Sequence, residues 1–313
     1  MAEWKILITD KLEEQGLMIL REAAQVDDRS GLPTDELVNI VPEYHALIVR
    51  SRTRVTAEIF AAGKKLKVVG RAGVGVDNID LSAATQHNVI VVNAPQATIM
   101  AVAEYTMCLI FALARPVTAA DASMKSGLWL KKELRGIEIH GKILGVIGMG
   151  NIGSAVAKLG AALGMIILGY DPLIPPSEIQ ARAAQPVELH ELYRRSDIIT
   201  IHVPLSPETR GMINGQALGL MKRGVRLVCT ARGGIIDETA LLGALESGHV
   251  AGAALDVFSK EPPGLSALVA HPHLVASPHI AAQTSEAQAR AAYDIATEVL
   301  AALRGEALRW RVV

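Results

Sequence analysis

The chain has 313 residues, half of them hydrophobic, and a formal net charge of −1. This length can hold two ordinary domains, and the near-zero charge argues against nucleic acid or an anionic membrane as the main partner. Two cysteines, Cys108 and Cys229, lie in apolar surroundings, so we expect buried free thiols and a reducing, cytoplasmic location. The start of the chain shows no secretory pattern, and the apolar run 107–114 is too short to span a bilayer.

The first part of the chain alternates short apolar runs with helical patterns. The runs predict buried strands at 5–8, 46–49, 68–70 and 89–92. Helical patterns lie between them at 12–23, 56–62 and 82–86. This alternation predicts a parallel α/β unit. A longer helical pattern then covers 98–126, with an interruption near Pro116.

A glycine-rich turn follows the next predicted strand, 143–147. Gly148, Gly150 and Gly153 form G-x-G-x-x-G, and a helical pattern begins at once. In this setting the glycines permit a tight turn, a close approach to a pyrophosphate and helix–strand packing. The helix N-terminus then offers N–H groups to the phosphates. The alternative is a purely structural βαβ unit.

An acid after the following strand indicates which dinucleotide binds. The predicted strand 165–170 ends at Asp171, 18 residues beyond Gly153, close to the roughly 20 expected for a ribose-binding acid. A carboxylate accepts hydrogen bonds from a ribose diol and repels a 2′-phosphate. No arginine follows it directly, so the sequence favours NAD over NADP.

Four further strands are predicted at 198–202, 227–229, 253–256 and 274–276, and a last amphipathic helix at 286–304. We expect this helix to pack on the first domain. The predicted fold is α/β, with two Rossmann-like domains built on doubly wound parallel sheets. The cofactor domain, 98–285, is inserted into a discontinuous substrate-binding domain, 1–97 and 286–313. We expect the substrate in the cleft between them.

Polar residues follow three of these strands, at the edge where a nicotinamide is expected. Arg232 follows 227–229, Glu261 follows 253–256, and His279 follows 274–276. In oxidation of a 2-hydroxy acid, an arginine binds the carboxylate, a histidine moves the hydroxyl proton, and an acid orients the imidazole. Each residue also has a structural alternative: Arg232 as a strand cap, Glu261 in a solvated turn, and His279 as a hydrogen-bonded histidine in a turn. No Cys/His spacing predicts a metal site.

Seven segments carry a resemblance to a known family. They are R-A-G-V-G-V-D-N-I-D from Arg71, N-A-P from Asn93, G-M-G-N-I-G from Gly148, H-V-P-L from His202, A-R-G-G-I-I-D-E from Ala231, A-L-D-V-F-S-K-E-P-P from Ala254 and P-H-I-A-A-Q-T-S-E-A-Q from Pro278. The chain resembles the D-2-hydroxyacid dehydrogenases, and most closely their D-3-phosphoglycerate dehydrogenase branch. The resemblance covers nearly the whole chain.

The resemblance implies roles for individual residues. It makes Arg232, Glu261 and His279 the catalytic set, with His279 as the acid/base. It implies that the cofactor contacts, beside the three glycines, are Asn151, Ile152, Asp171, Val203, Pro204, Thr230 and Asp256, with Asp256 on the nicotinamide carboxamide. It implies that the substrate contacts are Arg50, Ser51, Arg52, Arg71, Val74, Gly75 and Lys131. Lys131, close after Trp129, would come from the partner in a homodimer. Arg52 and Lys131 are alternatively solvated cations.

The implied reaction is NAD-dependent oxidation of D-3-phosphoglycerate to 3-phosphohydroxypyruvate, which opens phosphorylated serine synthesis. The chain departs from the family pattern at Ala97, Thr98, Tyr105, Cys229, Ala281 and Gln283. Ala97 and Thr98, in place of the usual Gly-Asn, bear on substrate identity. The alternatives are a glyoxylate, hydroxypyruvate or other 2-oxoacid reductase, and an NAD-sensing co-repressor-like protein. Because the chain stops soon after the last helix, we expect no serine feedback through a C-terminal regulatory domain.

Overall fold

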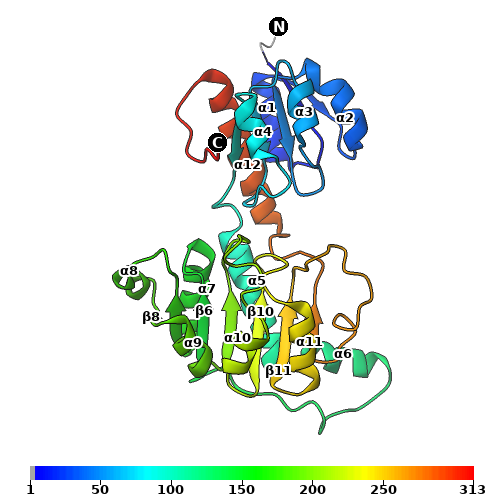
Figure 1. Ribbon diagram of the computed structural model, residues 1–313. Helices are drawn as coiled ribbons and strands as arrows, with labels where there is room; N and C mark the ends of the chain where they lie inside the picture. The colour runs from blue at the N-terminus through cyan, green and yellow to red at the C-terminus, as the bar shows by residue number, and fades with distance from the viewer. Residues whose placement is uncertain (1–3) are drawn as a thin grey trace. The chain divides into compact units, whose positions relative to one another are not determined.

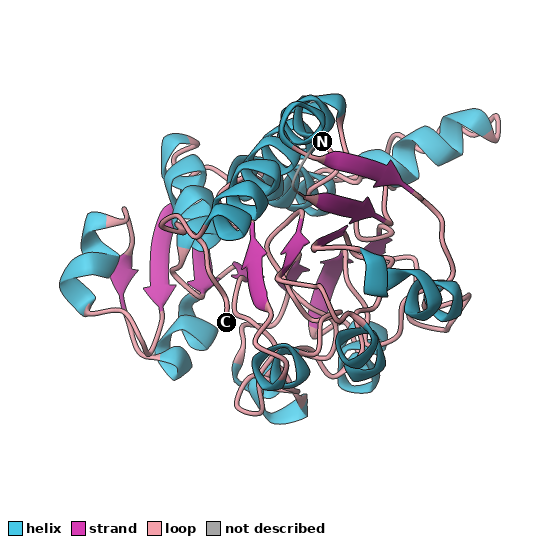
Figure 2. Ribbon diagram, turned by 90° about the horizontal axis from the view of Figure 1, so that it is seen from above, coloured by secondary structure: helices cyan, strands magenta, loops and turns pink. Residues whose placement is uncertain are grey.

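A computed structural model describes residues 4–313 of the chain. The chain divides into two compact units (Figure 1). One comprises Met1–Ile99 and Ala282–Val313, and the other comprises Met100–Ala281, where the sequence pattern predicts 98–285. In Figure 2 the strands run between layers of helices, as in α/β proteins.

The first unit contains a five-stranded parallel sheet with the order β2-β1-β3-β4-β5. Its strands are β1 (Lys5–Ile8), β2 (Gln25–Asp28), β3 (Ala46–Val49), β4 (Val68–Arg71) and β5 (Ile90–Asn93). Its helices are α1 (Glu14–Ala23), α2 (Thr34–Ile40), the 3₁₀ helix η1 (Val41–Glu43), α3 (Ala57–Ala62), α4 (Leu81–Gln86) and α12 (Ser285–Arg304). The central strand β3 is a fully buried apolar run because helices cover both faces of a parallel sheet.

Helix α12 packs on the first unit, which confirms the prediction for the last helix. Two glycines allow its close approach. A Cβ on Gly16 of α1 would lie 2.5 Å from the carbonyl oxygen of Ala292, and one on Gly70 of β4 would lie 2.5 Å from Cγ2 of Val299. Side chains at these two positions would therefore push α12 off α1 and the sheet.

The second unit contains a seven-stranded parallel sheet with the order β12-β11-β10-β9-β6-β7-β8. Its strands are β6 (Ile143–Ile147), β7 (Ile166–Tyr170), β8 (Gln185–Pro186), β9 (Ile198–Ile201), β10 (Val225–Cys229), β11 (Val250–Leu255) and β12 (Leu274–Ala276). Its helices are α5 (Ile99–Ala114), which begins at the unit boundary, α6 (Val117–Lys125), α7 (Asn151–Ala162), α8 (Pro176–Ala181), α9 (Leu189–Arg195), α10 (Gly215–Leu220) and α11 (Glu238–Glu246). The strand order reverses at β6, so the predicted doubly wound α/β fold is confirmed.

Two strands were not predicted from the sequence, and both lie at sheet edges. β2 has the sequence Q-V-D-D with no fully buried residue, and β8 is only two residues long. An edge strand needs no continuous apolar run, because it has a paired neighbour on only one side. The other predicted strands appear with boundaries shifted by a few residues.

Helix α5 has one buried face and one exposed face. Thr106, Met107 and Ile110 are buried, whereas positions 100, 104, 108 and 111 are exposed at helical spacing. The prediction of two buried thiols is therefore wrong for Cys108, which is exposed, and right for Cys229. Among residues 4–313, no single helix is long and apolar enough to cross a membrane. Helices α5 and α6, bent by 66° at their break, pass that test only as a pair, by length and composition.

Candidate active site

The predicted site residues of the second unit follow adjacent strands. Arg232 comes shortly after β10, Asp256 directly follows β11, and His279 follows β12. These three strands are neighbours in the sheet and run parallel. Their carboxyl ends therefore meet at one edge, which is where ligands bind in doubly wound folds.

His279 and Glu261 form a hydrogen-bonded pair. Nδ1 of His279 lies 2.9 Å from Oε2 of Glu261, and their side chains are 47% and 40% exposed. The other carboxylate oxygen of Glu261 accepts a hydrogen bond from the Phe258 N–H at 3.1 Å. Because Nδ1 faces the carboxylate, Nε2 is the ring nitrogen that can exchange a proton with a ligand.

Asp256 holds the segment that carries His279. The residue is fully buried. Its Oδ1 accepts hydrogen bonds from Ser277 Oγ at 2.6 Å and Ile280 N at 2.9 Å, and its Oδ2 accepts from Ala281 N at 2.8 Å. The Asp256 carbonyl also accepts from His279 N. Asp256 is thus a structural anchor for the histidine, in addition to the cofactor role that the family resemblance implies.

Arg232 is brought to the same place by the glycine that follows it. A Cβ on Gly233 would lie 1.8 Å from the Phe258 carbonyl oxygen, so this position accepts only glycine unless the backbone moves. The A-R-G-G turn therefore packs directly on the peptide that leads to Glu261. Arg232 Nη1 donates to the Ala231 carbonyl at 2.7 Å.

Tyr105, which departs from the family pattern, belongs to this same cluster. It lies on α5 and shares a hydrogen bond with Ser277, the residue that donates to Asp256. Burial raises the pKa of the Tyr105 hydroxyl above its ordinary value. Although tyrosine at position 105 departs from the family pattern, it places a polar group next to Ser277.

The glycine turn has the shape of a dinucleotide site. Gly148 adopts φ +90°, and a Cβ on Gly153 would lie 1.9 Å from the Gly148 carbonyl oxygen. In contrast, a Cβ on Gly150 would meet no atom within 4 Å. Gly150 is the N-cap of α7 and makes no side-chain cap hydrogen bond. Open space at Gly150, directly before exposed Asn151 and half-buried Ile152 at the start of α7, fits a pyrophosphate bound at the helix N-terminus.

Asp171 lies at the end of β7 beside this turn. Its Oδ2 accepts from Met149 N and its Oδ1 from Leu173 N, both at 2.9 Å. Each carboxylate oxygen can accept a second bond, so a ribose diol remains compatible with both contacts. Sequence reasoning missed Arg182, which donates to the Met149 carbonyl and lies 3.4 Å from Ser154 Oγ.

The remaining predicted cofactor residues border the turn and the sheet edge. The Val203 Cγ1 atom would lie 2.9 Å from a Cβ on Gly148, and exposed Pro204 follows it. Thr230 is buried and its Oγ1 lies 3.0 Å from Thr106 Oγ1. The cofactor residues named from the sequence are therefore all in the second unit, along β6, β7, β9, β10 and β11. Residues 4–313 contain no group of three or more His, Cys, Asp or Glu that could hold a metal ion.

The substrate residues are divided between the units. Arg50 follows β3 and Arg71 ends β4, the next strand. The Arg71 guanidinium covers Gly73, where a Cβ would lie 1.6 Å from Nη1. Val74 accepts a hydrogen bond from Asn93 Nδ2, and Gly75 is half-buried. Lys131 lies on an exposed segment of the second unit, near Trp129, which is 76% exposed.

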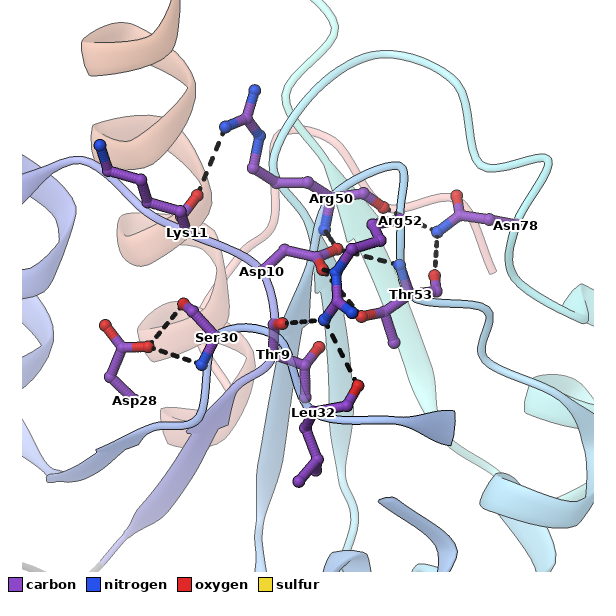
Figure 3. A network of polar contacts seen from close by, with 10 residues as sticks. All are labelled: Thr9, Asp10, Lys11, Asp28, Ser30, Leu32, Arg50, Arg52, Thr53 and Asn78. Carbon is purple, nitrogen blue, oxygen red and sulfur yellow. Dashed lines mark hydrogen bonds and ion pairs between the residues drawn. The ribbon is translucent and has the colours of Figure 1, made fainter. Parts of the chain in front are cut away.

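Asp10, Thr53 and Asn78 were missed by sequence reasoning. Asp10 and Asn78 bind the turn from Arg50 to Thr53, and Thr53 Oγ1 donates to Asp10 (Figure 3). One signal was available for Asp10, because an acid two residues after the apolar run of β1 is a polar residue at a strand end. Thr53 and Asn78 gave no such signal, since their role depends on contacts across 43 and 25 residues of sequence.

His202 is a half-buried histidine next to the cofactor turn. Its ring Nε2 lies 2.9 Å from Thr200 Oγ1, and its main-chain N–H donates to the Ile147 carbonyl. Burial lowers the pKa of the imidazole from 6.5 to about 3. The ring is therefore neutral at pH 7, and folding resists its protonation.

We expect the stability of the second unit to fall as pH drops below about 6.5, because the unfolded chain takes up a proton at His202 before the folded protein does. The loss continues down to the folded pKa of about 3, at up to ~1.4 kcal/mol per pH unit. Urea unfolding between pH 7 and pH 4 measures this decrease in the free energy of unfolding. The stability difference between wild type and His202→Gln should shrink as pH falls. The control His87→Gln removes an exposed histidine and should run parallel to wild type; a parallel His202→Gln curve contradicts the prediction.

Comparison with known proteins identifies relatives of this chain. Residues 107–281 match the family described as D-isomer specific 2-hydroxyacid dehydrogenase, NAD binding domain. D-3-phosphoglycerate dehydrogenase of Methanocaldococcus jannaschii is 47% identical over 96% of this chain, and that of Homo sapiens is 45% identical over 97%. The chain spans only 58% and 57% of the length of these two relatives.

Solved structures agree with this relationship. The TT0316 protein from Thermus thermophilus has a TM-score of 0.90 at 35% identity, covering 99% of this chain and 100% of that one. A glyoxylate reductase from Paecilomyes thermophila has a TM-score of 0.90 at 29% identity, covering 100% and 99%. The family match extends over more than half of the chain and includes the glycine turn, Arg232, Glu261 and His279. The chain therefore belongs to the D-isomer specific 2-hydroxyacid dehydrogenase family, and residues 107–281 are its NAD-binding domain.

Proposed function

We propose that this chain catalyses NAD-dependent oxidation of the 2-hydroxyl of D-3-phosphoglycerate to 3-phosphohydroxypyruvate, a step of serine biosynthesis. The observation that carries the proposal is the His279–Glu261 pair, at 2.9 Å, beside the Arg232 turn at the carboxyl edge of an NAD-binding sheet. The names of the curated relatives at 45–47% identity support the choice of substrate.

The trio divides the chemistry of the oxidation. Arg232 binds the substrate carboxylate and fixes the orientation of C2. His279 accepts the hydroxyl proton at Nε2, and the Glu261 carboxylate at Nδ1 stabilises the imidazolium that results. When bound, NAD⁺ accepts the C2 hydrogen with its electron pair. In the reverse direction His279 returns the proton to the carbonyl oxygen. Asp256 and Ser277 hold the histidine in place for both directions.

The phosphate of the substrate is assigned to cations of the first unit. We propose Arg50 and Arg71 as its ligands, with Ser51, Val74 and Gly75 in contact and Lys131 supplied by a second copy of the chain. Two guanidinium groups at the ends of neighbouring strands suit a dianion, since charge-assisted hydrogen bonds to phosphate are among the strongest polar contacts.

A second candidate function keeps the chemistry but not the phosphate. Ala97 and Thr98 replace the usual Gly-Asn of the family, and both are buried, at 1% and 4% exposure. The Ala97 carbonyl accepts a hydrogen bond from Arg290 Nε at 3.0 Å. Together with the similarity to a solved glyoxylate reductase, these substitutions favour a glyoxylate, hydroxypyruvate or other 2-oxoacid reductase as the alternative.

A steady-state substrate panel tests the choice of substrate. With NAD, we expect kcat/KM for 3-phosphoglycerate to exceed that for D-glycerate by about 10- to 100-fold, the worth of one or two charge-assisted contacts. Replacing NAD by NADP should lower kcat/KM, because Asp171 repels a 2′-phosphate. Glyoxylate and hydroxypyruvate are measured with NADH in the reductive direction. Equal kcat/KM values with and without the phosphate contradict the leading proposal and favour the reductase.

Removal of the histidine tests the mechanism. His279→Ala should lower kcat by about 10²- to 10⁴-fold with little change in KM, since the proton loses its acceptor. Stopped-flow measurement of NADH formation reports hydride transfer directly. The control His273→Ala removes an exposed histidine just before β12 and should leave the rate unchanged. Unaltered hydride transfer in His279→Ala would refute the acid/base assignment.

We also propose that two copies of the chain associate through α6 and the segment after it. Val117, Met124, Leu128 and Trp129 are exposed there, by 52–76%. Large apolar side chains gathered on one stretch are typical of a protein–protein contact.

Multi-angle light scattering tests this association. We expect about twice the 33.3 kDa mass of one chain at assay concentration. Trp129→Lys should shift the population toward the single-chain mass, because it places a charge in a desolvated contact. Leu173, 90% exposed on the loop after β7, gives the matched control Leu173→Lys, which should not. A single-chain mass for wild type removes both the dimer and the role of Lys131.

A further inference from the structure

The turn from Arg50 to Thr53 is fixed at both ends by two side chains. Asp10 Oδ2 accepts from Arg50 N at 2.7 Å and from Thr53 N at 3.1 Å. On the other side, Asn78 Nδ2 donates to the Arg50 carbonyl at 2.7 Å and to the Thr53 carbonyl at 2.6 Å. The main-chain N–H and C=O groups of both end residues are therefore bound, and only Ser51 and Arg52 form the exposed tip.

Asp10 is a buried carboxylate with four hydrogen bonds. Besides the two main-chain N–H groups, its Oδ1 accepts from Thr53 Oγ1 at 2.9 Å and from Arg52 Nε at 3.0 Å. Its side chain is only 4% exposed. Burial of an ionised carboxylate is costly unless it is paired and fully hydrogen-bonded. The turn thus supplies the hydrogen bonds that the Asp10 carboxylate requires, and the same bonds fix the turn.

The two arginines of the turn are used differently (Figure 3). Arg52 folds back onto the protein: beyond Asp10, its Nη2 donates to the Thr9 carbonyl at 2.7 Å and lies 3.4 Å from the Leu32 carbonyl. The Arg50 side chain leaves the network, and its Nη1 makes one long contact, 3.4 Å, with the Lys11 carbonyl. Arg50 is half-buried, and burial lowers the pKa of its guanidinium from the usual value.

We infer that Asp10 is a positioning residue that shapes the Arg50–Thr53 turn into an anion site, with Arg50 as the ligand and Arg52 as the counter-ion of Asp10. The inference rests on the proposed function, because the anion is the phosphate of the substrate. It changes the role expected for Arg52, whose Nε donates to Asp10 and whose Nη2 is directed at two carbonyl groups.

The burial of Asp10 explains why a positively charged residue, Arg52, pairs with it. An unpaired carboxylate beneath the turn would repel a phosphate and attract Arg50 toward itself. Arg52 neutralises the charge of Asp10, so Asp10 fixes the main chain without adding net negative charge to the site. The positive charge of Arg50 then remains available to the ligand.

The test uses four variants of the full chain, assayed with 3-phosphoglycerate and with D-glycerate. Asp10→Asn replaces an acceptor by an N–H₂ group that faces the N–H donors of the turn. We expect KM for 3-phosphoglycerate to rise about 10-fold or more, with kcat and the D-glycerate parameters changed less than about 2-fold. Arg50→Gln should give at least the same loss, and Arg52→Gln a several-fold smaller one. Asp28→Asn, at an exposed aspartate that accepts hydrogen bonds from Ser30, is the matched control and should behave as wild type.

Hydrogen exchange adds a readout that needs no substrate. The amides of Arg50 and Thr53 should exchange faster in Asp10→Asn, while those of β1 and β3 stay protected. If Asp10→Asn does not fold, Asn78→Ala loosens the same turn from the other side and should raise the same KM. This inference alone is overturned if Asp10→Asn or Asn78→Ala keeps the preference for the phosphorylated substrate. It is also overturned if Arg52→Gln raises KM for 3-phosphoglycerate as much as Arg50→Gln does. A wild-type enzyme without phosphate preference overturns the proposed function instead, and the exchange result then still decides whether Asp10 holds the turn.

Discussion

The geometry of the candidate active site depends on a buried carboxylate, Asp256, at the end of β11. Three donors from the segment 277–281 converge on its two oxygens. An ionised group inside a protein is tolerated only when its hydrogen bonds are made, so the carboxylate and the segment fix one another. His279 lies in the middle of that segment with φ +55°. A left-handed conformation costs a non-glycine residue about 1–2 kcal/mol, and the anchoring at Ser277, Ile280 and Ala281 opposes relaxation.

The other two members of the trio reach the histidine through the topology of the sheet and one glycine. Glu261 lies on the chain that leaves Asp256, so the anchor of the histidine and the acid that orients it share one loop. Gly233 allows the turn after β10 to rest on that same loop, with only 1.8 Å between a hypothetical Cβ and the Phe258 oxygen. Arginine, acid and histidine thus lie at one edge of the sheet because three parallel neighbouring strands end there.

Much of this arrangement could be predicted from sequence because its signals are local. Apolar runs predicted the buried strands, the glycine spacing predicted the turn at Gly148, and polar residues after strands predicted the trio. The misses have a common physical origin. The edge strand β2 makes hydrogen bonds without an apolar run, and the exposure of Cys108 depends on which face of α5 is covered. The network around Asp10 joins it to residues that are 40 to 43 positions away, so no short window of sequence contains it.

The two units use the same device for different ends. In each, an aspartate after a buried strand accepts hydrogen bonds from the main chain of a functional loop: Asp10 after β1 and Asp256 after β11. The difference lies in the remaining donors. Asp256 binds N–H and hydroxyl groups, so no cation balances its charge near His279, which becomes positive in the proposed mechanism. Asp10 also binds a guanidinium, so its charge is balanced at the turn where we propose that an anion binds. The charge of the remaining hydrogen-bond donor therefore decides whether the surroundings of such an aspartate favour a cation or an anion. In the first unit this donor is the positively charged Arg52, which favours an anion.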